Sequence, residues 1–209
     1  MIVISHRGYW KQPAEKNSVE AFSRSFNLGL GTETDIRDHC CDLVISHDMP
    51  AGNEISLVKF LDLLQDQSLP LALNIKADGL AEKIKSVMTH YDRDNWFVFD
   101  MSIPDMRAHL ACGNPVYARV SEIEPEPVCF DEITGIWLDA FYYDDWRLER
   151  IGPWLAQGKR VCLVSPELHG RDHQPLWKNL RETGFIRDPH LMLCTDHPED
   201  AQQYFGNIP

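Results

Sequence analysis

The sequence predicts a compact (β/α)8 barrel (a TIM barrel), built as a single domain over residues 1–209. Short apolar runs typical of strands alternate with segments of helical periodicity almost to the end of the chain. The links between successive strands, with one exception, are long enough to hold a helix, as parallel strands require. Polar side chains follow several of these runs, at the strand ends where a parallel barrel builds its active site.

The predicted strands are short runs bounded by polar or turn-forming residues. They are expected at residues 2–4, 32–36, 71–74, 96–99, 116–120, 135–138, 160–164 and 191–194. A further apolar run at residues 43–45 follows the second strand too closely for a helix to intervene. We interpret it as a short return strand.

Helices are expected where apolar residues recur at helical spacing after a capping residue. Asn17 or Ser18 can cap the first helix, which Gly29 ends, and Ser56 can cap the second. The later helices are expected at residues 80–89, from Ser102 or Asp105 to near Gly113, at 146–155, at 175–183 and after Pro198. Between residues 121 and 134, where two prolines interrupt the chain, a solvated loop and one helical turn near residues 129–132 are expected.

Charge and composition restrict the partners. Against 20 Lys and Arg the chain has 32 Asp and Glu, a net charge of −12, which argues against nucleic acid or an anionic membrane as a partner. No run of about 18 apolar residues predicts a membrane span. The start of the chain has no basic segment before its apolar stretch, and the six cysteines form no CxxC pair. We therefore expect a cytoplasmic protein with reduced thiols.

Four polar fragments carry the candidate chemistry. They are Ser5-His6-Arg7-Gly8, Glu33-Thr34-Asp35, His47-Asp48 and Asn74-Ile75-Lys76. If the strand ends converge, as in a barrel, two histidines, two acids and two cations share one pocket. Such a set can bind a divalent metal, hold a phosphate and move protons.

Glu33 and Asp35 are two residues apart on a strand and so point to the same face. Paired carboxylates repel each other unless a cation lies between them, and hard oxygen ligands favour Mg²⁺ or Ca²⁺. The alternative is a solvated or salt-bridged pair without a metal.

His6 and His47 are the candidate acid–base pair, because imidazole titrates near neutral pH. Alternatively, His6 is a hydrogen-bonded core histidine and His47 is part of an ordinary turn. Arg7 and Lys76 offer positive charge for a phosphate, unless they are simple surface cations.

A polar loop at residues 165–173 follows a predicted strand and should face the same pocket. Within it, Glu167 and His169 are candidate substrate-binding residues or supports for such residues. The alternative is that both are ordinary loop residues.

These fragments, in this order and at strand ends, resemble the glycerophosphodiester phosphodiesterase family, and the segment Thr195-Asp196-His197-Pro198 is similar to that family's Thr-Asp-x-Pro. The resemblance implies a metal-dependent phosphoric diester hydrolase that converts a small glycerophosphodiester-like substrate to an alcohol and a glycerol phosphate. It implies that His6 and His47 are catalytic. It also implies that Glu15, which with Asn17 is similar to a Glu-Asn segment of the family, binds substrate.

The chain departs from the family in two places. Asn74 stands where the family commonly has a glutamate metal ligand, so the expected ligands are Glu33, Asp35 and the uncharged Asn74. Glu167 or Asp139 could instead supply the missing carboxylate. The sizeable insertion that often follows the family's His-Asp is reduced to residues 49–55. A phospholipase-type phosphodiesterase on a related barrel and a catalytically weak phosphoester-binding relative therefore stay open as alternatives.

Overall fold

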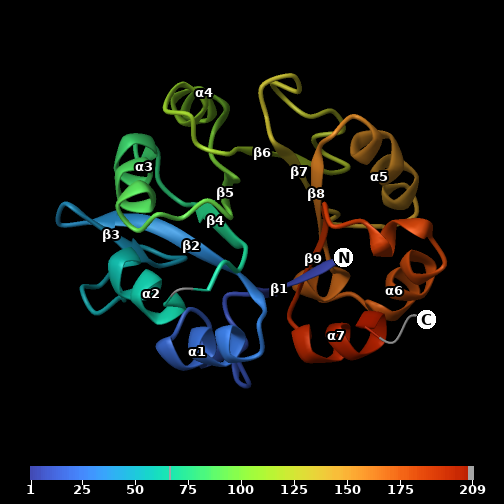
Figure 1. Ribbon diagram of the computed structural model, residues 1–209, viewed down its shortest axis with the longest axis horizontal. Helices are drawn as coiled ribbons and strands as arrows, with labels where there is room; N and C mark the ends of the chain where they lie inside the picture. The colour runs from blue at the N-terminus through green and yellow to red at the C-terminus, as the bar shows by residue number, and fades with distance from the viewer. Residues whose placement is uncertain (66, 207–209) are drawn as a thin grey trace. The chain divides into compact units, whose positions relative to one another are not determined.

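The computed structural model describes residues 1–65 and 67–206, and the chain divides into two compact units. The N-terminal unit is Arg7–Tyr117. The C-terminal unit combines Met1–His6 with Ala118–Pro209. In both, the repeating element is a buried parallel strand followed by a helix (Figure 1). Among the described residues, no helix is both long and apolar enough to cross a bilayer.

The N-terminal unit is a small parallel sheet with one antiparallel strand at its side. The parallel order is β5 (Trp96–Phe99), β4 (Leu71–Ile75) and β2 (Gly31–His39). Strand β3 (Asp42–Ile45) returns antiparallel along the end of β2, which agrees with the predicted return strand. Every residue of β4 and β5 is buried, which explains their nearly continuous apolar sequence.

Serine residues cap three of the four α-helices that the structure describes in this unit. Ser18, Ser56 and Ser102 each accept a hydrogen bond from the backbone three residues ahead, as helix-capping serines do. The helices are α1 (Val19–Asn27), α2 (Leu57–Leu64), α3 (Ala81–His90) and α4 (Ile103–Ala111). Figure 1 shows α1 and α2 side by side.

The C-terminal unit is a parallel sheet that includes the first strand of the chain. Its order is β1 (Ile2–His6), β9 (Leu191–Thr195), β8 (Arg160–Val164), β7 (Gly135–Leu138) and β6 (Tyr117–Val120). Strand β1 pairs in parallel with β9, so the start and the end of the chain share one sheet. The carboxyl ends of these strands therefore lie along one edge.

In the described part of this unit, three α-helices and one short 3₁₀ segment bear on the site. They are α5 (Arg147–Ala156), α6 (Gln174–Arg181), α7 (Pro198–Gly206) and the 3₁₀ segment η2 (Pro166–His169). The polar loop that the sequence placed after β8 is thus a turn of 3₁₀ helix, which Gly170 ends with a φ of 71°.

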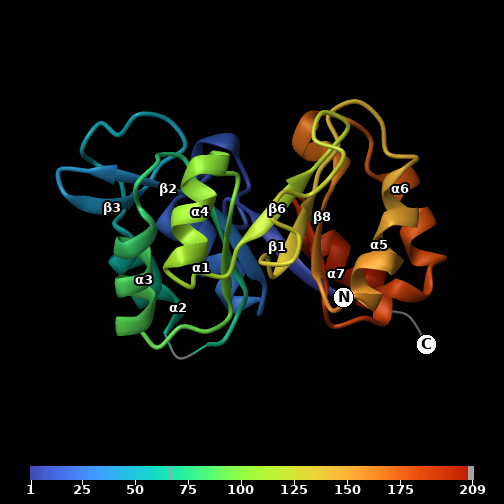
Figure 2. The same ribbon diagram turned by 90° about the horizontal axis from the view of Figure 1, so that it is seen from above.

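The crossover from β6 to β7 has no α-helix, which agrees with the predicted loop and single helical turn. Figure 2 shows the segment as a loop. Its one helical turn forms where the sequence predicts it, because the carbonyl of Cys129 accepts hydrogen bonds from Glu132 (2.9 Å) and Ile133 (3.1 Å). Pro125 and Pro127 prevent a longer helix. Earlier in the loop, the carboxylate of Glu122 accepts three backbone N–H groups.

Arg147, the first residue of α5, is fully buried in the C-terminal unit. Its guanidinium donates to the carbonyls of Leu138 (3.3 Å) and Val164 (2.6 Å), the last residues of β7 and β8, and pairs with Asp144. Burial lowers the pKa of Arg147 from its ordinary value, and the neighbouring carboxylates partly offset that effect. This cation therefore links the carboxyl ends of two adjacent strands.

Candidate active site

An open cavity of about 520 Å³ lies in the N-terminal unit. Arg7, Lys16 and His47 are among the residues that line it, and the lining comes from the segment before α1 and from the β3–α2 link. Two of these three, Arg7 and His47, are residues that the sequence singled out for chemistry. Lys16 is not among them. Three basic groups around one cavity are suited to an anion such as a phosphate.

Asp35 is a buried anion that pairs with two cations, Arg7 and Lys76. Its side chain is fully buried, with Oδ2 2.9 Å from the Nε of Arg7 and Oδ1 3.5 Å from the Nζ of Lys76. The amide of Asn17 also donates to Oδ2, at 2.9 Å. A buried carboxylate needs such partners, and it holds the arginine side chain in place. Arg7, Asp35 and Lys76, predicted from separate fragments, thus form one ion-paired group.

The turn that carries Arg7 depends on Gly8. Both residues have positive φ, 56° and 79° respectively, a conformation that glycine adopts without strain. A Cβ atom on Gly8 would lie 2.8 Å from the backbone carbon of Ala21. The N–H of Arg7 donates to the carboxylate of Glu33 at 3.1 Å, so this turn also fixes a predicted metal ligand.

The predicted ligands Glu33, Asp35 and Asn74 offer the oxygen atoms that hard cations prefer, but only two of the three side chains carry a negative charge. Asp35 and Asn74 are directly paired in the register of β2 and β4. The Oδ1 atoms of both are buried without a hydrogen-bond partner, and such orphaned oxygens are possible donors to Mg²⁺ or Ca²⁺. Lys76, however, already supplies one positive charge beside Asp35. Within residues 1–65 and 67–206, no group of three or more His, Cys, Asp or Glu side chains is arranged to hold a metal.

Glu15 is engaged by Arg24 of α1 and by the backbone of Lys11 rather than by the cavity. Its carboxylate pairs with the Nη1 of Arg24 at 2.5 Å and accepts the N–H of Lys11 at 2.8 Å. The hydrogen bond from Arg24, with that from the Lys11 backbone, lowers the pKa of Glu15 to about 2. The contacts shown are those of a residue that shapes the segment before α1; its predicted substrate contact stays a prediction.

His47 is the more exposed of the two predicted catalytic histidines. Its Nδ1 lies 2.9 Å from the Oδ1 of Asp48, and the two side chains are 48% and 93% exposed. The backbone carbonyl of His47 accepts a bond of 3.3 Å from the Nε of Arg37. The structure therefore fixes the backbone of His47 and leaves its ring accessible.

His6, the other predicted catalytic histidine, ends β1 in the C-terminal unit. Its Nδ1 lies 2.7 Å from the Oδ1 of Asp196, which follows β9. Glu167 supports this pair, because its Oε1 accepts the N–H of Asp196 at 3.1 Å and the hydroxyl of Thr195. Asp196 was not singled out as a site residue from the sequence, although the Thr-Asp-x-Pro fragment that contains it was the available signal.

His169 forms a second histidine–carboxylate pair in the same unit. Its Nε2 lies 2.7 Å from the Oδ1 of Asp139, the residue directly after β7. The ring of Phe141 packs edge-on against the imidazole, with centroids 4.9 Å apart. Asp139 and Glu167, each considered as the missing metal ligand, thus both hold hydrogen bonds within the C-terminal unit.

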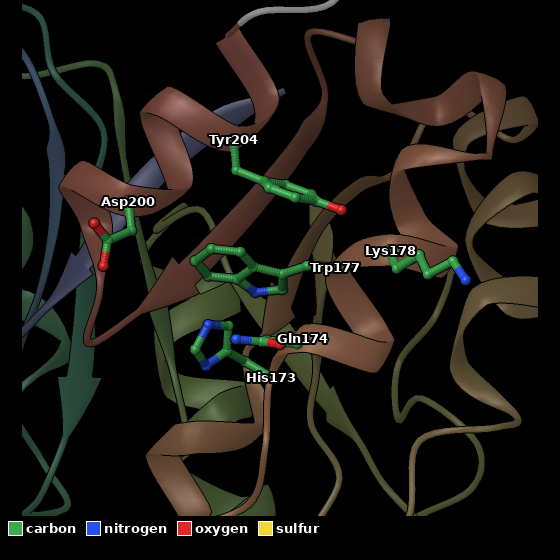
Figure 3. Close-up of a pocket in the computed structure, with 6 residues that line it drawn as sticks. All are labelled: His173, Gln174, Trp177, Lys178, Asp200 and Tyr204. Carbon is green, nitrogen blue, oxygen red and sulfur yellow. The ribbon is translucent and has the colours of Figure 1, made fainter.

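A second cavity, of about 510 Å³, lies between α6 and α7 in the C-terminal unit (Figure 3). The rings of His173, Trp177 and Tyr204 form much of its wall. Gln174, Lys178 and Asp200 also line it. None of the residues that the sequence singled out for chemistry is among these six.

The similarity of this chain to known proteins lies in its structure and not in its sequence. No family model and no curated protein matches the sequence. The fold is similar to that of a glycerophosphodiester phosphodiesterase from Agrobacterium tumefaciens, with 14% identity, a TM-score of 0.75 and coverage of 99% of this chain and 100% of that one. It is similar to an Oleispira antarctica phosphodiesterase in complex with the product sn-glycerol-3-phosphate, with 15% identity, a TM-score of 0.67 and coverage of 99% and 97%.

A third similar structure is a glycerophosphoryl diester phosphodiesterase from Parabacteroides distasonis, with 15% identity, a TM-score of 0.67 and coverage of 100% of this chain and 87% of that one. Since each match covers nearly the whole chain, the predicted fold class, a compact (β/α)8 barrel, is confirmed. The resemblance that the motifs indicated is borne out at the level of fold: this chain is similar in structure to glycerophosphodiester phosphodiesterases.

Proposed function

We propose that this protein is a phosphoric diester hydrolase that cleaves a small glycerophosphodiester-like substrate to an alcohol and a glycerol phosphate. One observation carries the proposal: Arg7, braced by the buried Asp35, lines the same cavity as His47. A guanidinium held in this way can bind a phosphodiester by two parallel hydrogen bonds. The likeness in fold to three such enzymes supports the same reaction class.

Each side chain has a task in the proposed mechanism. Arg7 and Lys16 bind the phosphate oxygens and stabilise the negative charge that develops on them. His6 and His47 exchange protons with the attacking and leaving oxygens, and Asp196 holds the ring of His6 in one orientation. Glu33, Asp35 and Asn74 would hold a divalent cation, which when bound supplies further stabilisation of phosphate charge.

A substrate panel tests the reaction class. We expect hydrolysis of glycerophosphodiesters with different alcohols, with the alcohol and a glycerol phosphate as products. A phosphatidic acid from a phospholipid would instead indicate the phospholipase-type alternative. If the protein binds a glycerol phosphate but converts none of these diesters with Mg²⁺, Ca²⁺ or Mn²⁺ present, the proposal is wrong and the binding relative is correct.

Asn74→Glu tests the metal site. Adding a carboxylate beside Asp35 is expected to tighten binding of Mg²⁺ and Ca²⁺, because hard cations respond to ligand charge. Calorimetric titration of both variants measures this, with Asn95→Glu as the control at the amino end of β5. Unchanged affinity in Asn74→Glu would place Asn74 outside the metal shell, and full wild-type activity in EDTA would remove the metal from the proposal.

One feature favours the alternative of a catalytically weak phosphoester-binding relative. Lys76 lies 3.5 Å from Asp35 and 3.8 Å from Asp100, and an ammonium there supplies part of the charge that a metal would bring. Such a site can bind a phosphate without a cation. The panel above separates the two, since only the enzyme converts its ligand.

A further inference from the structure

Lys76 lies between two carboxylates of the N-terminal unit, and only one of them, Asp35, belongs to the expected metal ligands. We propose that Asp100 is a second partner for the ammonium of Lys76: the ammonium leaves Asp35 for Asp100 when a divalent cation takes its place beside Asp35. Asp100 is then a positioning residue for the metal site. The inference rests on the proposed function and adds to it the way in which this chain makes room for the cation.

The first argument is that neither carboxylate holds the ammonium tightly. The Nζ of Lys76 is 3.5 Å from the Oδ1 of Asp35 and 3.8 Å from the Oδ2 of Asp100. Both distances allow ionic attraction, but both exceed the roughly 2.7–3.2 Å of an N–H···O hydrogen bond. Since no short hydrogen bond to either carboxylate has to break, the ammonium can move from one to the other with little loss of free energy.

The second argument is that the backbone of Lys76 is fixed, so only its side chain has to move. The N–H of Lys76 donates to the carbonyl of Ile36 at 2.9 Å, which continues the pairing of β2 with β4. The flexible lysine side chain can then swing about a stationary Cα. Asp35 also stays in place, because Arg7 and Asn17 each hold its Oδ2 at 2.9 Å. Its Oδ1 is therefore the oxygen for which Lys76 and a cation compete.

The third argument is that the loop of Asp100 is joined to the loop of Lys76. Lys76 directly follows β4, and Asp100 directly follows β5, the strand paired with β4. Two residues further along both loops, the hydroxyl of Ser102 donates to the carboxylate of Asp78 at 3.0 Å. The carboxylate of Asp100 therefore stays within reach of the ammonium, whichever partner the ammonium takes.

The fourth argument is the backbone conformation of Asp100. Its φ is 70°, in the left-handed region that glycine adopts without strain and that other residues adopt at a cost in free energy. Aspartate is one of the few residues that tolerate this region. The chain thus keeps a side chain where the backbone alone would favour glycine, and that side chain is the carboxylate beside Lys76.

Charge explains why a second carboxylate is required. A divalent cation beside Asp35 repels the ammonium of Lys76, and like charges repel most strongly where water is largely excluded. The side chain of Asp35 is fully buried and that of Lys76 is 18% exposed, so solvent screens this repulsion only weakly. With Asp100 as its partner, the ammonium stays ion-paired while the cation binds Asp35. The affinity for the cation should therefore depend on Asp100 through Lys76.

A double-mutant cycle measured by metal titration tests this coupling and needs no substrate. Calorimetry gives the affinity for Mg²⁺ and Ca²⁺ in the wild type, in Asp100→Asn, in Lys76→Met and in the variant with both changes. We expect Asp100→Asn to weaken binding about tenfold when Lys76 is present, and less than about twofold in the Lys76→Met background. Lys76→Met alone should bind both cations more tightly than the wild type, because no ammonium competes for the Oδ1 of Asp35.

Two outcomes of the cycle would overturn the inference. Equal weakening in both backgrounds would mean that Asp100 acts on the cation directly, as a ligand or through its charge. Unchanged affinity in Asp100→Asn would mean that Asp100 has no part in the site. Circular dichroism checks that each variant folds, and Lys76→Gln, which keeps a polar group, completes the cycle if Lys76→Met does not fold.

Asp92→Asn is the matched control. Asp92 also has a left-handed backbone, with a φ of 50°, but it is exposed and lies between α3 and β5. The substitution removes the same charge as Asp100→Asn, so unchanged affinity is expected, and an equal loss would overturn the inference in favour of net charge. If no variant binds either cation, the inference fails and the metal leaves the proposed function, whereas the substrate panel decides the reaction class independently.

Discussion

Replacing His6 with alanine is expected to lower turnover of a glycerophosphodiester by about 100-fold or more, the usual weight of a general acid or base. The ring lies against Asp196 at 2.7 Å, so the protein fixes its orientation, and alanine removes both the proton carrier and that arrangement. Steady-state kinetics on the substrate that the panel identifies give the measurement. A rate within a few-fold of the wild type would show that His6 is not catalytic.

Asp196→Asn distinguishes orientation from chemistry in the same site. The amide keeps the shape of Asp196 but is a poorer hydrogen-bond acceptor and carries no charge to stabilise an imidazolium. We expect kcat to fall with little change in KM, and the pH profile of kcat to shift. A change confined to KM would instead make Asp196 a substrate-binding residue.

The largest expected effect on stability is that of Arg147→Ala, about 3–5 kcal/mol in the free energy of unfolding, because it breaks a buried ionic and hydrogen-bonded group. The variant loses the bonds to the carbonyls of Leu138 and Val164 and leaves Asp144 with one guanidinium fewer. Chemical denaturation followed by circular dichroism measures the difference. A loss below about 1 kcal/mol would mean that other groups or water satisfy these carbonyls.

Arg150→Ala, on the same helix, is the control for Arg147→Ala. Arg150 pairs at 3.3 Å with Glu126, whose side chain is 78% exposed, and it lies over the ring of Trp154. An exposed ion pair of this kind contributes little, so the change should stay within about 1 kcal/mol. Similar losses in both variants would show that helix α5, rather than the buried position, sets the cost.

The strand ends were predictable because they depend on local pattern. An apolar run that ends in polar residues identifies β4, and in β2 the period of two places Glu33 and Asp35 on one face. The capping residue of α1 was left open between two neighbours. The structure assigns the cap to Ser18, while Asn17 bridges Thr34 and Asp35 instead.

Charged partners far apart in sequence were not predictable. Nothing near Arg147 in the sequence distinguishes it from a surface arginine in the first turn of a helix, and only the folded chain brings it against Leu138 and Val164. The same holds for Asp139 and His169, which are thirty residues apart. Local periodicity determines which face a residue occupies, whereas its partner depends on how the strands are ordered.

The crossover from β6 to β7 shows how a barrel of this size can dispense with a helix. A helix would cover its strand by packing apolar area, and that stabilisation persists at any protonation state. Here the carboxylate of Glu122 organises the following loop through the N–H groups of Phe141, Tyr142 and Tyr143. Burial raises the pKa of Glu122, but these bonds outweigh it and hold the value at about 2.

Because the folded pKa of Glu122 lies below the ordinary value of 4.5, the contribution of this carboxylate is complete above that value. It is lost progressively as the pH falls from 4.5 towards 2. This crossover therefore lacks a helix of about ten residues, and part of its stability depends instead on pH. As the pH falls below 4.5, this crossover is therefore expected to lose stability before the helices that cover the neighbouring strands.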